Sequence, residues 1–98
     1  MPNGKPLEVE VEKDKGIGTY SNFVMIYHTA SEFVLDFARV MPGLSKAKVM
    51  SRIIMTPQHA KMLLKALEDN LKKYESRFGE IKIQGADTKK IGFQSGSE

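Results

Sequence analysis

The chain has 98 residues, of which 41% are hydrophobic and 28% charged, so it has room for one domain with a modest core and is too apolar to be disordered throughout. It contains no cysteine, which excludes disulfides, thiolate metal sites and cysteine nucleophiles and favours the reducing cytoplasm over secretion. The sequence shows neither a signal peptide nor a stretch near the roughly 18 apolar residues of a spanning helix, so a cytoplasmic protein without membrane insertion is expected.

The charge is small in total but unevenly placed. A net charge of +3 does not by itself indicate a nucleic-acid partner. Between Phe37 and Leu67 there is no acidic residue, and six cations follow one another: Arg39, Lys46, Lys48, Arg52, Lys61 and Lys65. This segment is the basic region of the chain.

The N-terminal part predicts a short flexible start and one strand. Residues 1–6 carry two prolines and a glycine, which favour irregular backbone. From Leu7 to Val11 apolar residues alternate with glutamates, the period of two that is typical of a half-buried edge strand. We expect Gly16 and Gly18 to end this strand.

Three further strands are predicted in the middle of the chain. They span Thr19–Thr29, Phe33–Met41 and Lys46–Met55, with a turn at residues 30–32 and a break at Pro42 and Gly43. The first of the three is apolar on both faces, with Val24, Ile26 and His28 opposing Phe23, Met25 and Tyr27.

One long amphipathic helix is predicted after the strands. Thr56 is a good N-cap, Pro57 suits the first helical position, and Gly79 suits the C-terminal cap. Between Pro57 and Phe78 the apolar residues follow helical spacing in a single stripe, which comprises Ala60, Leu63, Leu64, Leu67, Leu71, Tyr74 and Phe78. The predicted fold class is therefore α+β: an antiparallel sheet of about four strands and one C-terminal helix in a single domain (residues 7–84), followed by a flexible tail (residues 85–98).

Candidate catalytic residues are few. His28 and His59 are better interpreted as structural than as ligands of one metal, and no metal or cofactor is predicted. Asp36 is either a perturbed carboxylate or a surface group that faces water or pairs with Arg39 or Arg52. No nucleophile, base and orienting group occur at suggestive spacing, so no catalytic residue and no enzymatic activity are predicted.

The apolar residues of the sheet suggest an interface. One helix can cover only one face of a sheet, so some apolar surface remains, with Val24, Ile26, Met50 and Ile54 as its candidate members. Flexible methionines suit either a core or an adaptable binding groove. We expect self-association into a dimer or tetramer, together with binding of protein or peptide segments.

The alternative partner is an anion. Arg39, Lys46, Lys48 and Arg52 would neutralise phosphates, including those of a nucleic acid, if they shared one face. The plain alternative is that these residues are a solvated basic surface.

Several short segments carry a resemblance to a known family. They are Tyr20-Ser21-Asn22, the strand Ser51-Arg52-Ile53-Ile54, the helix start Thr56-Pro57 with His59-Ala60-Lys61, and Tyr74-Glu75 before Phe78-Gly79. Over residues 20–81 the chain resembles a group of small bacterial and archaeal proteins known as domain-of-unknown-function family 3467. That resemblance implies the order of elements and leaves the function open. In architecture alone, strands followed by one long helix also look like the SecB export chaperone, whose protomers assemble and hold unfolded polypeptides in apolar grooves.

Overall fold

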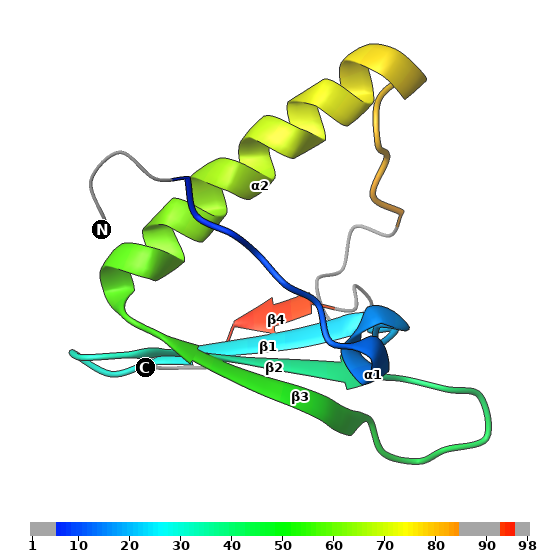
Figure 1. Cartoon of the computed structure of the whole chain (residues 1–98). Coiled ribbons are helices and arrows are strands. Elements are labelled where there is room, and N and C mark those ends of the chain that lie inside the picture. The colour runs from blue at the N-terminus through cyan, green and yellow to red at the C-terminus, as the bar shows by residue number, and fades with distance from the viewer. Residues whose placement is uncertain (1–5, 85–92, 96–98) are drawn as a thin grey trace.

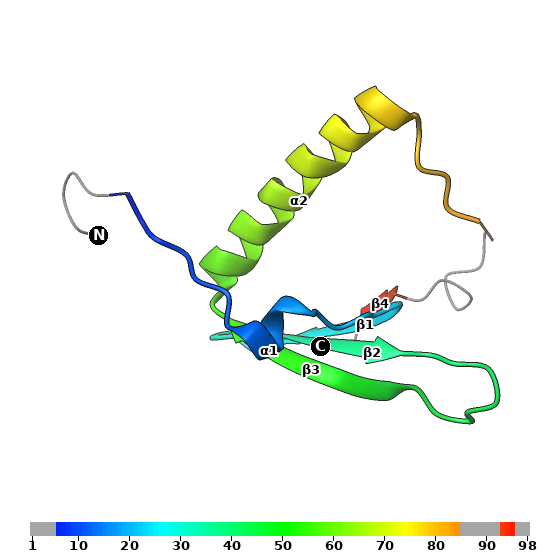
Figure 2. The same ribbon diagram turned by 45° about the vertical axis from the view of Figure 1, so that its right-hand side comes forward.

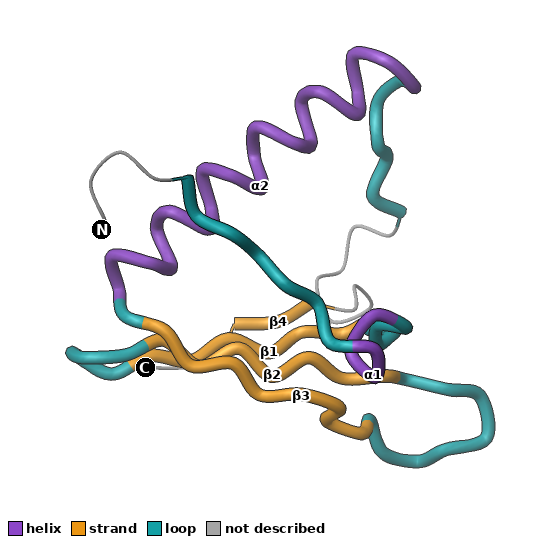
Figure 3. Tube along the Cα trace, viewed as in Figure 1, coloured by secondary structure: helices purple, strands orange, loops and turns teal. Residues whose placement is uncertain are grey.

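The computed structural model describes residues 6–84 and 93–95. Its centre is an antiparallel sheet of three strands: β1 (Phe23–His28), β2 (Phe33–Arg39) and β3 (Lys48–Met55). The one-turn helix α1 (Lys13–Gly16) precedes the sheet, and the long helix α2 (Pro57–Phe78) follows it (Figure 1). A short strand, β4 (Phe93–Ser95), pairs in parallel with β1, so the strand order is β3-β2-β1-β4 (Figure 3).

The predicted α+β class is confirmed, but the antiparallel sheet has three strands rather than four. The strand expected at Leu7–Val11 is wrong, because this segment lies outside the sheet with its apolar side chains exposed. An extended segment needs a neighbouring strand for its backbone hydrogen bonds, and this segment pairs with neither β1, whose outer side is taken by β4, nor the outer edge of β3. Two segments were expected to be flexible, residues 1–6 and residues 85–98. Of these, residues 1–5, 85–92 and 96–98 lie outside the described part, and residues 93–95 form β4.

Local sequence signals place the ends of the strands. Between β1 and β2 the hydroxyl of Thr29 accepts from the backbone N–H groups of Ser31 and Glu32 at 3.1 and 3.2 Å, which closes the predicted turn. After β2 the chain turns at Gly43, whose φ of 86° is favourable for glycine. The strands predicted at Phe33–Met41 and Lys46–Met55 are thus confirmed within a few residues.

A β-bulge interrupts β3 near its start. Phe37 of β2 faces Ser51, whereas the next residue, Ala38, faces Val49, so Met50 is the extra residue. The regular part of the pairing therefore runs from Ser51 to Met55.

Helix α2 begins and ends as its caps predict. The hydroxyl of Thr56 accepts from the backbone N–H of His59 at 3.2 Å, Pro57 follows at the first helical position, and Gly79 ends the helix with a φ of 101°. The predicted bounds are confirmed. Twenty-two residues correspond to a helix of about 33 Å.

The helix does not pack on the sheet. It leaves the end of β3 and rises away from the sheet in both views (Figures 1 and 2). No residue of α2 is buried, and the buried apolar residues of the described chain are Val24, Leu35 and Ala38, all in the sheet. The expectation that the helix covers one sheet face within the chain is therefore wrong.

Global dimensions agree with this open arrangement. The chain exposes 9075 Å², whereas a compact monomer of its 11.0 kDa would expose about 5,600 Å². Its radius of gyration is 16.4 Å, against about 13 Å for a compact domain of this length. The single chain thus leaves much more surface in water than a self-sufficient fold does.

Candidate binding surfaces

The strand register divides the sheet side chains into two faces, because residues paired across antiparallel strands point to the same side. We call one the apolar face; it comprises Val24, Ile26, His28, Phe33, Leu35, Phe37, Ser51, Ile53 and Met55. The opposite, ion-pair face comprises Phe23, Met25, Tyr27, Val34, Asp36, Ala38, Val49, Arg52 and Ile54.

The apolar face carries little polarity. Its polar members are Ser51 and His28, whose ring stacks on Phe33 with the centroids 5.3 Å apart, and the paired cations Arg39 and Lys48 lie on the same side at its end. Val24 and Leu35 are buried, whereas Ile26 and Ile53 are exposed. This face is suited to another apolar surface.

The ion-pair face is built around one buried carboxylate. Asp36 is 2% exposed, and both of its oxygens accept from the guanidinium of Arg52, Nε to Oδ1 at 2.6 Å and Nη2 to Oδ2 at 2.8 Å. This two-point hydrogen bond, which outweighs the opposing effect of burial, holds the pKa of Asp36 below its usual value. The same contact raises the pKa of Arg52. Of the alternatives for Asp36, pairing with Arg52 is the one observed.

The four candidate interface residues do not form one patch. Val24 and Ile26 lie on the apolar face, Ile54 lies on the ion-pair face, and Met50 is the extra residue of the bulge. Met50 and Ile54 are both exposed on β3, at the open edge of the sheet.

The four candidate anion-binding residues are also divided. Arg52 is on the ion-pair face and is paired with Asp36. Arg39 and Lys48 face each other across β2 and β3, on the same side as the apolar face, while Lys46 precedes β3. Within the described chain, the structure therefore brings together two of the four cations.

Helix α2 presents an apolar surface along its length. The large side chains of the predicted stripe, Leu63, Leu64, Leu67, Leu71, Tyr74 and Phe78, are between 41% and 66% exposed. The rings of Tyr74 and Phe78 contact each other, with their centroids 4.9 Å apart. The spacing of the apolar residues predicts this stripe, but the structure leaves it exposed instead of packed in the core of its own chain.

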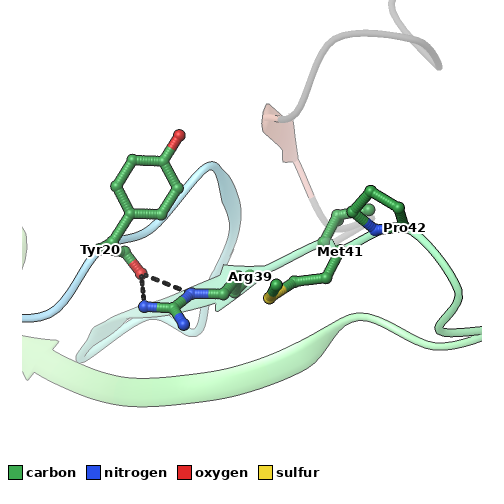
Figure 4. Close-up of a pocket in the computed structure, with 5 residues that line it drawn as sticks. Tyr20, Arg39, Met41 and Pro42 are labelled. Carbon is green, nitrogen blue, oxygen red and sulfur yellow. Dashed lines mark hydrogen bonds between the residues drawn. The ribbon is translucent and has the colours of Figure 1, made fainter.

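A pocket at the end of β2 was not predicted. Tyr20, Arg39, Val40, Met41 and Pro42 line an open hollow of about 320 Å³ (Figure 4). Arg39 donates to the carbonyl oxygen of Tyr20 from Nε and Nη2, both at 3.4 Å, and its guanidinium carbon lies 5.6 Å from the centroid of the Tyr20 ring. The pocket is shallow and its cation is already bonded, so it does not by itself define a ligand.

Ser21 and Asn22 hold this corner in place. The hydroxyl of Ser21 donates to the carbonyl of Ala38 at 2.8 Å. The side chain of Asn22 accepts from the N–H of Val40 at 2.8 Å and donates to its carbonyl at 3.0 Å, as a backbone partner would. The Tyr-Ser-Asn segment is therefore a structural clamp between the start of β1 and the end of β2.

The remaining candidates do not form a reactive centre. His59 contributes to the helix start, where its Nδ1 lies 2.9 Å from the Thr56 hydroxyl. In the described part of the chain, no three histidine or carboxylate side chains gather as metal ligands. Among the same residues, no helix is long and apolar enough to cross a membrane.

The fold and these surfaces define a small α+β protein with an open sheet edge and an unpacked helix. The chain belongs to the family described as Protein of unknown function (DUF3467), whose family model matches residues 1–83. The resemblance seen in the sequence is thereby confirmed. No curated protein and no solved structure matches the chain.

Proposed function

We propose that this protein is a non-enzymatic, homo-oligomeric module that binds extended protein or peptide segments by adding them as a strand to the free edge of β3. The observation that carries the proposal is the state of β3 itself. It is an edge strand of eight residues, and its outer side has no partner strand in the described structure. Edge strands of this length are templates for pairing with another chain.

The side chains of β3 suit an apolar peptide. Val49, Met50 and Ile54 are exposed, and methionine adapts to ligands of varied shape. Backbone hydrogen bonds along the edge would supply affinity without regard to sequence, while these side chains would favour apolar residues at alternate positions.

The charges favour a peptide over a nucleic acid. Arg52, the cation of the regular part of β3, is neutralised by Asp36. Arg39 already bonds to the Tyr20 carbonyl. Phosphate binding would therefore have to compete with existing contacts for half of the candidate cations.

The state of the Asp36 carboxylate supports the proposal that the protein has no enzymatic activity. This buried carboxylate is the described acidic group best placed for unusual chemistry, but both of its oxygens are bound by Arg52. A lowered pKa and occupied oxygens are features of a structural ion pair.

Fluorescence anisotropy tests the proposal with three labelled probes at low and high salt. The probes are an unstructured apolar peptide, the same peptide with alternate backbone nitrogens methylated, and a DNA duplex. We expect binding of the first peptide that changes little with salt, and loss of binding on methylation, because methylated nitrogens cannot pair with a strand.

Two variants locate the site. Ile54→Glu on β3 should weaken peptide binding roughly tenfold or more, whereas Met62→Glu on α2 should leave it unchanged. Equal binding of both peptides would reject strand addition. Tight, salt-sensitive binding of DNA that is lost in the double variant Lys48→Glu, Arg39→Glu would instead support the anion-binding alternative.

A further inference from the structure

The apolar stripe of α2 needs a partner that the described part of its own chain does not provide. Its large side chains are about half exposed, and the helix rises away from the sheet along its whole length (Figures 1 and 2). A soluble helix with such a stripe is stabilised mainly by packing it against another apolar surface.

The connection between β3 and α2 restrains the direction of the helix. Thr56 is the single residue between Met55, the last of β3, and Pro57, the first of α2. Its carbonyl accepts from the N–H of Ala60 at 2.9 Å and its hydroxyl accepts from that of His59, so it belongs to the helix cap. A hinge this short fixes the direction of the helix, and short hinges favour exchange of an element between copies over closure within one.

We propose that the α2 stripe of each copy docks on the apolar face of a second copy, in a reciprocal exchange that completes the core of both chains. This inference rests on the homo-oligomeric part of the proposed function and names the surfaces that make the assembly. The edge of β3 is left free for a peptide.

The apolar area that the two α2 stripes could bury is enough for a stable dimer. Six half-exposed side chains of roughly 200 Å² each give about 600 Å² of apolar surface from one stripe. Two stripes give about 1,200 Å² before any sheet surface is counted, and stable interfaces begin near that total.

The composition of the two sheet faces selects the docking site. On the ion-pair face, the exposed part of Arg52 would lie under the leucines of the stripe and lose its contact with water. On the apolar face, Ile26 and Ile53 are exposed at the centre of β1 and β3 with no charge between them. The stripe therefore fits the apolar face.

Adjacent residues provide matched variants for a test. Ile53 and Ile54 are neighbours in β3, 42% and 55% exposed, and lie on opposite faces. Leu67 and Met62 are 54% and 57% exposed on α2, and only Leu67 belongs to the stripe. The mass of the full chain and of each variant would be measured by sedimentation equilibrium across a range of protein concentrations.

We expect the wild type to have the mass of two chains or a multiple of two. Leu67→Glu and Ile53→Glu should each raise the dissociation constant by roughly 100-fold or more, while Met62→Glu and Ile54→Glu should not change it. An equimolar mixture of Leu67→Glu and Ile53→Glu should associate more tightly than either variant alone, because the intact helix of one fits the intact sheet of the other at one of the two contacts.

Each other result contradicts the exchange. A monomeric wild type would mean that α2 closes on its own sheet or stays open. Loss of association in Ile54→Glu would place the contact on the ion-pair face or the β3 edge. An Ile53→Glu variant that still forms dimers would indicate pairing of helix with helix. A mixture that associates no more tightly than the single variants would show that the helix of one copy does not meet the sheet of the other. Peptide binding would also be measured with Leu67→Glu. Binding by this variant as a monomer would show that the peptide site works without the exchange, so failure of the exchange and failure of peptide binding can be told apart.

Discussion

Asp36 and Arg52 form a two-point ion pair in the sheet. Asp36 is buried, so its charge is tolerated only because the guanidinium of Arg52 donates to both of its oxygens. The pKa of Asp36 is consequently lower in the folded chain than in the unfolded one.

This pKa shift predicts the acid sensitivity of the fold. A lowered carboxylate pKa contributes stability that is fully present above the unfolded value of about 3.9 and is lost as pH falls through the folded pKa. We expect the unfolding free energy of the wild type to fall below about pH 4, and Asp36→Asn to fall less steeply there. Denaturant melts from pH 7 to pH 2 would measure both slopes; parallel curves for the two proteins would contradict the assignment.

The clamp made by Asn22 gives a second prediction. Asn22→Ala removes two hydrogen bonds to the backbone of Val40 and should lower the unfolding free energy by about 1–2 kcal/mol. Asn22→Asp keeps the acceptor but sets a carboxylate oxygen against the Val40 carbonyl oxygen, so it should destabilise the fold as well. The control is Asn70→Ala on α2, where the amide donates to the Ala66 carbonyl on an exposed surface, with an expected change within about 0.5 kcal/mol. Thermal melts that rank Asn70→Ala above Asn22→Ala would refute the clamp.

At the residue scale, the sequence predicts which groups can pair better than it predicts where they lie in the fold. Pairing of Asp36 with Arg52 was one of the expected alternatives, because the two residues lie on strands that could pair. The choice of Arg52 over Arg39 depends on the register, in which Asp36 faces Arg52 directly. The bulge at Met50 helps to fix the register of β3 on β2, and no short sequence pattern predicts this bulge.

At the scale of elements, α2 is the part most sensitive to partners. Leu67→Ala removes a large stripe residue, which should cost about 2–5 kcal/mol if the stripe is buried between copies. In an isolated chain its 54% exposure would limit the loss to well under that range. Lys72→Ala, which changes an exposed side chain, should cost less than about 0.5 kcal/mol.

Denaturant unfolding at two protein concentrations would measure both changes. For an assembled protein the unfolding midpoint of the wild type should rise with concentration, and Leu67→Ala should lie well below it at each one. Equal effects of Leu67→Ala and Lys72→Ala would remove the helix stripe from the interface.

Local signals explain which elements could be predicted. The bounds of α2 follow from Thr56, Pro57 and Gly79, whose effects act within one turn. The segment Leu7–Val11 has the alternation of a strand but no partner strand in the described structure. Alternation predicts which side chains share a face, but it does not predict whether a neighbouring strand is available. The pairing of β4 with β1 joins segments far apart in the chain, which no local pattern encodes.

At the scale of the whole molecule, the proposed exchange predicts that the hinge at Thr56 decides between exchange and closure. Inserting Gly-Ser-Gly between Met55 and Thr56 should let α2 fold back onto its own apolar face, because the longer flexible hinge removes the restraint on helix direction while Thr56 still caps the helix. We expect this variant to sediment as a monomer with unchanged helix content by circular dichroism. An insertion after Gly79, outside the hinge, is the control and should leave the mass of the assembly unchanged. Persistence of the wild-type mass after the insertion before Thr56 would show that the hinge does not direct the exchange.

The small core within one chain also bears on how the protein is made. Val24, Leu35 and Ala38 are the apolar residues that are buried within the described part of one chain. If the proposed exchange completes the core, a newly synthesised copy would reach its full stability only after it meets another. Its folding would then be a second-order process, with a rate set by the number of chains present as well as by their sequence. At low expression, the exposed stripe and the open β3 edge would persist longer, and so would the exposure of each new chain to proteases and to aggregation.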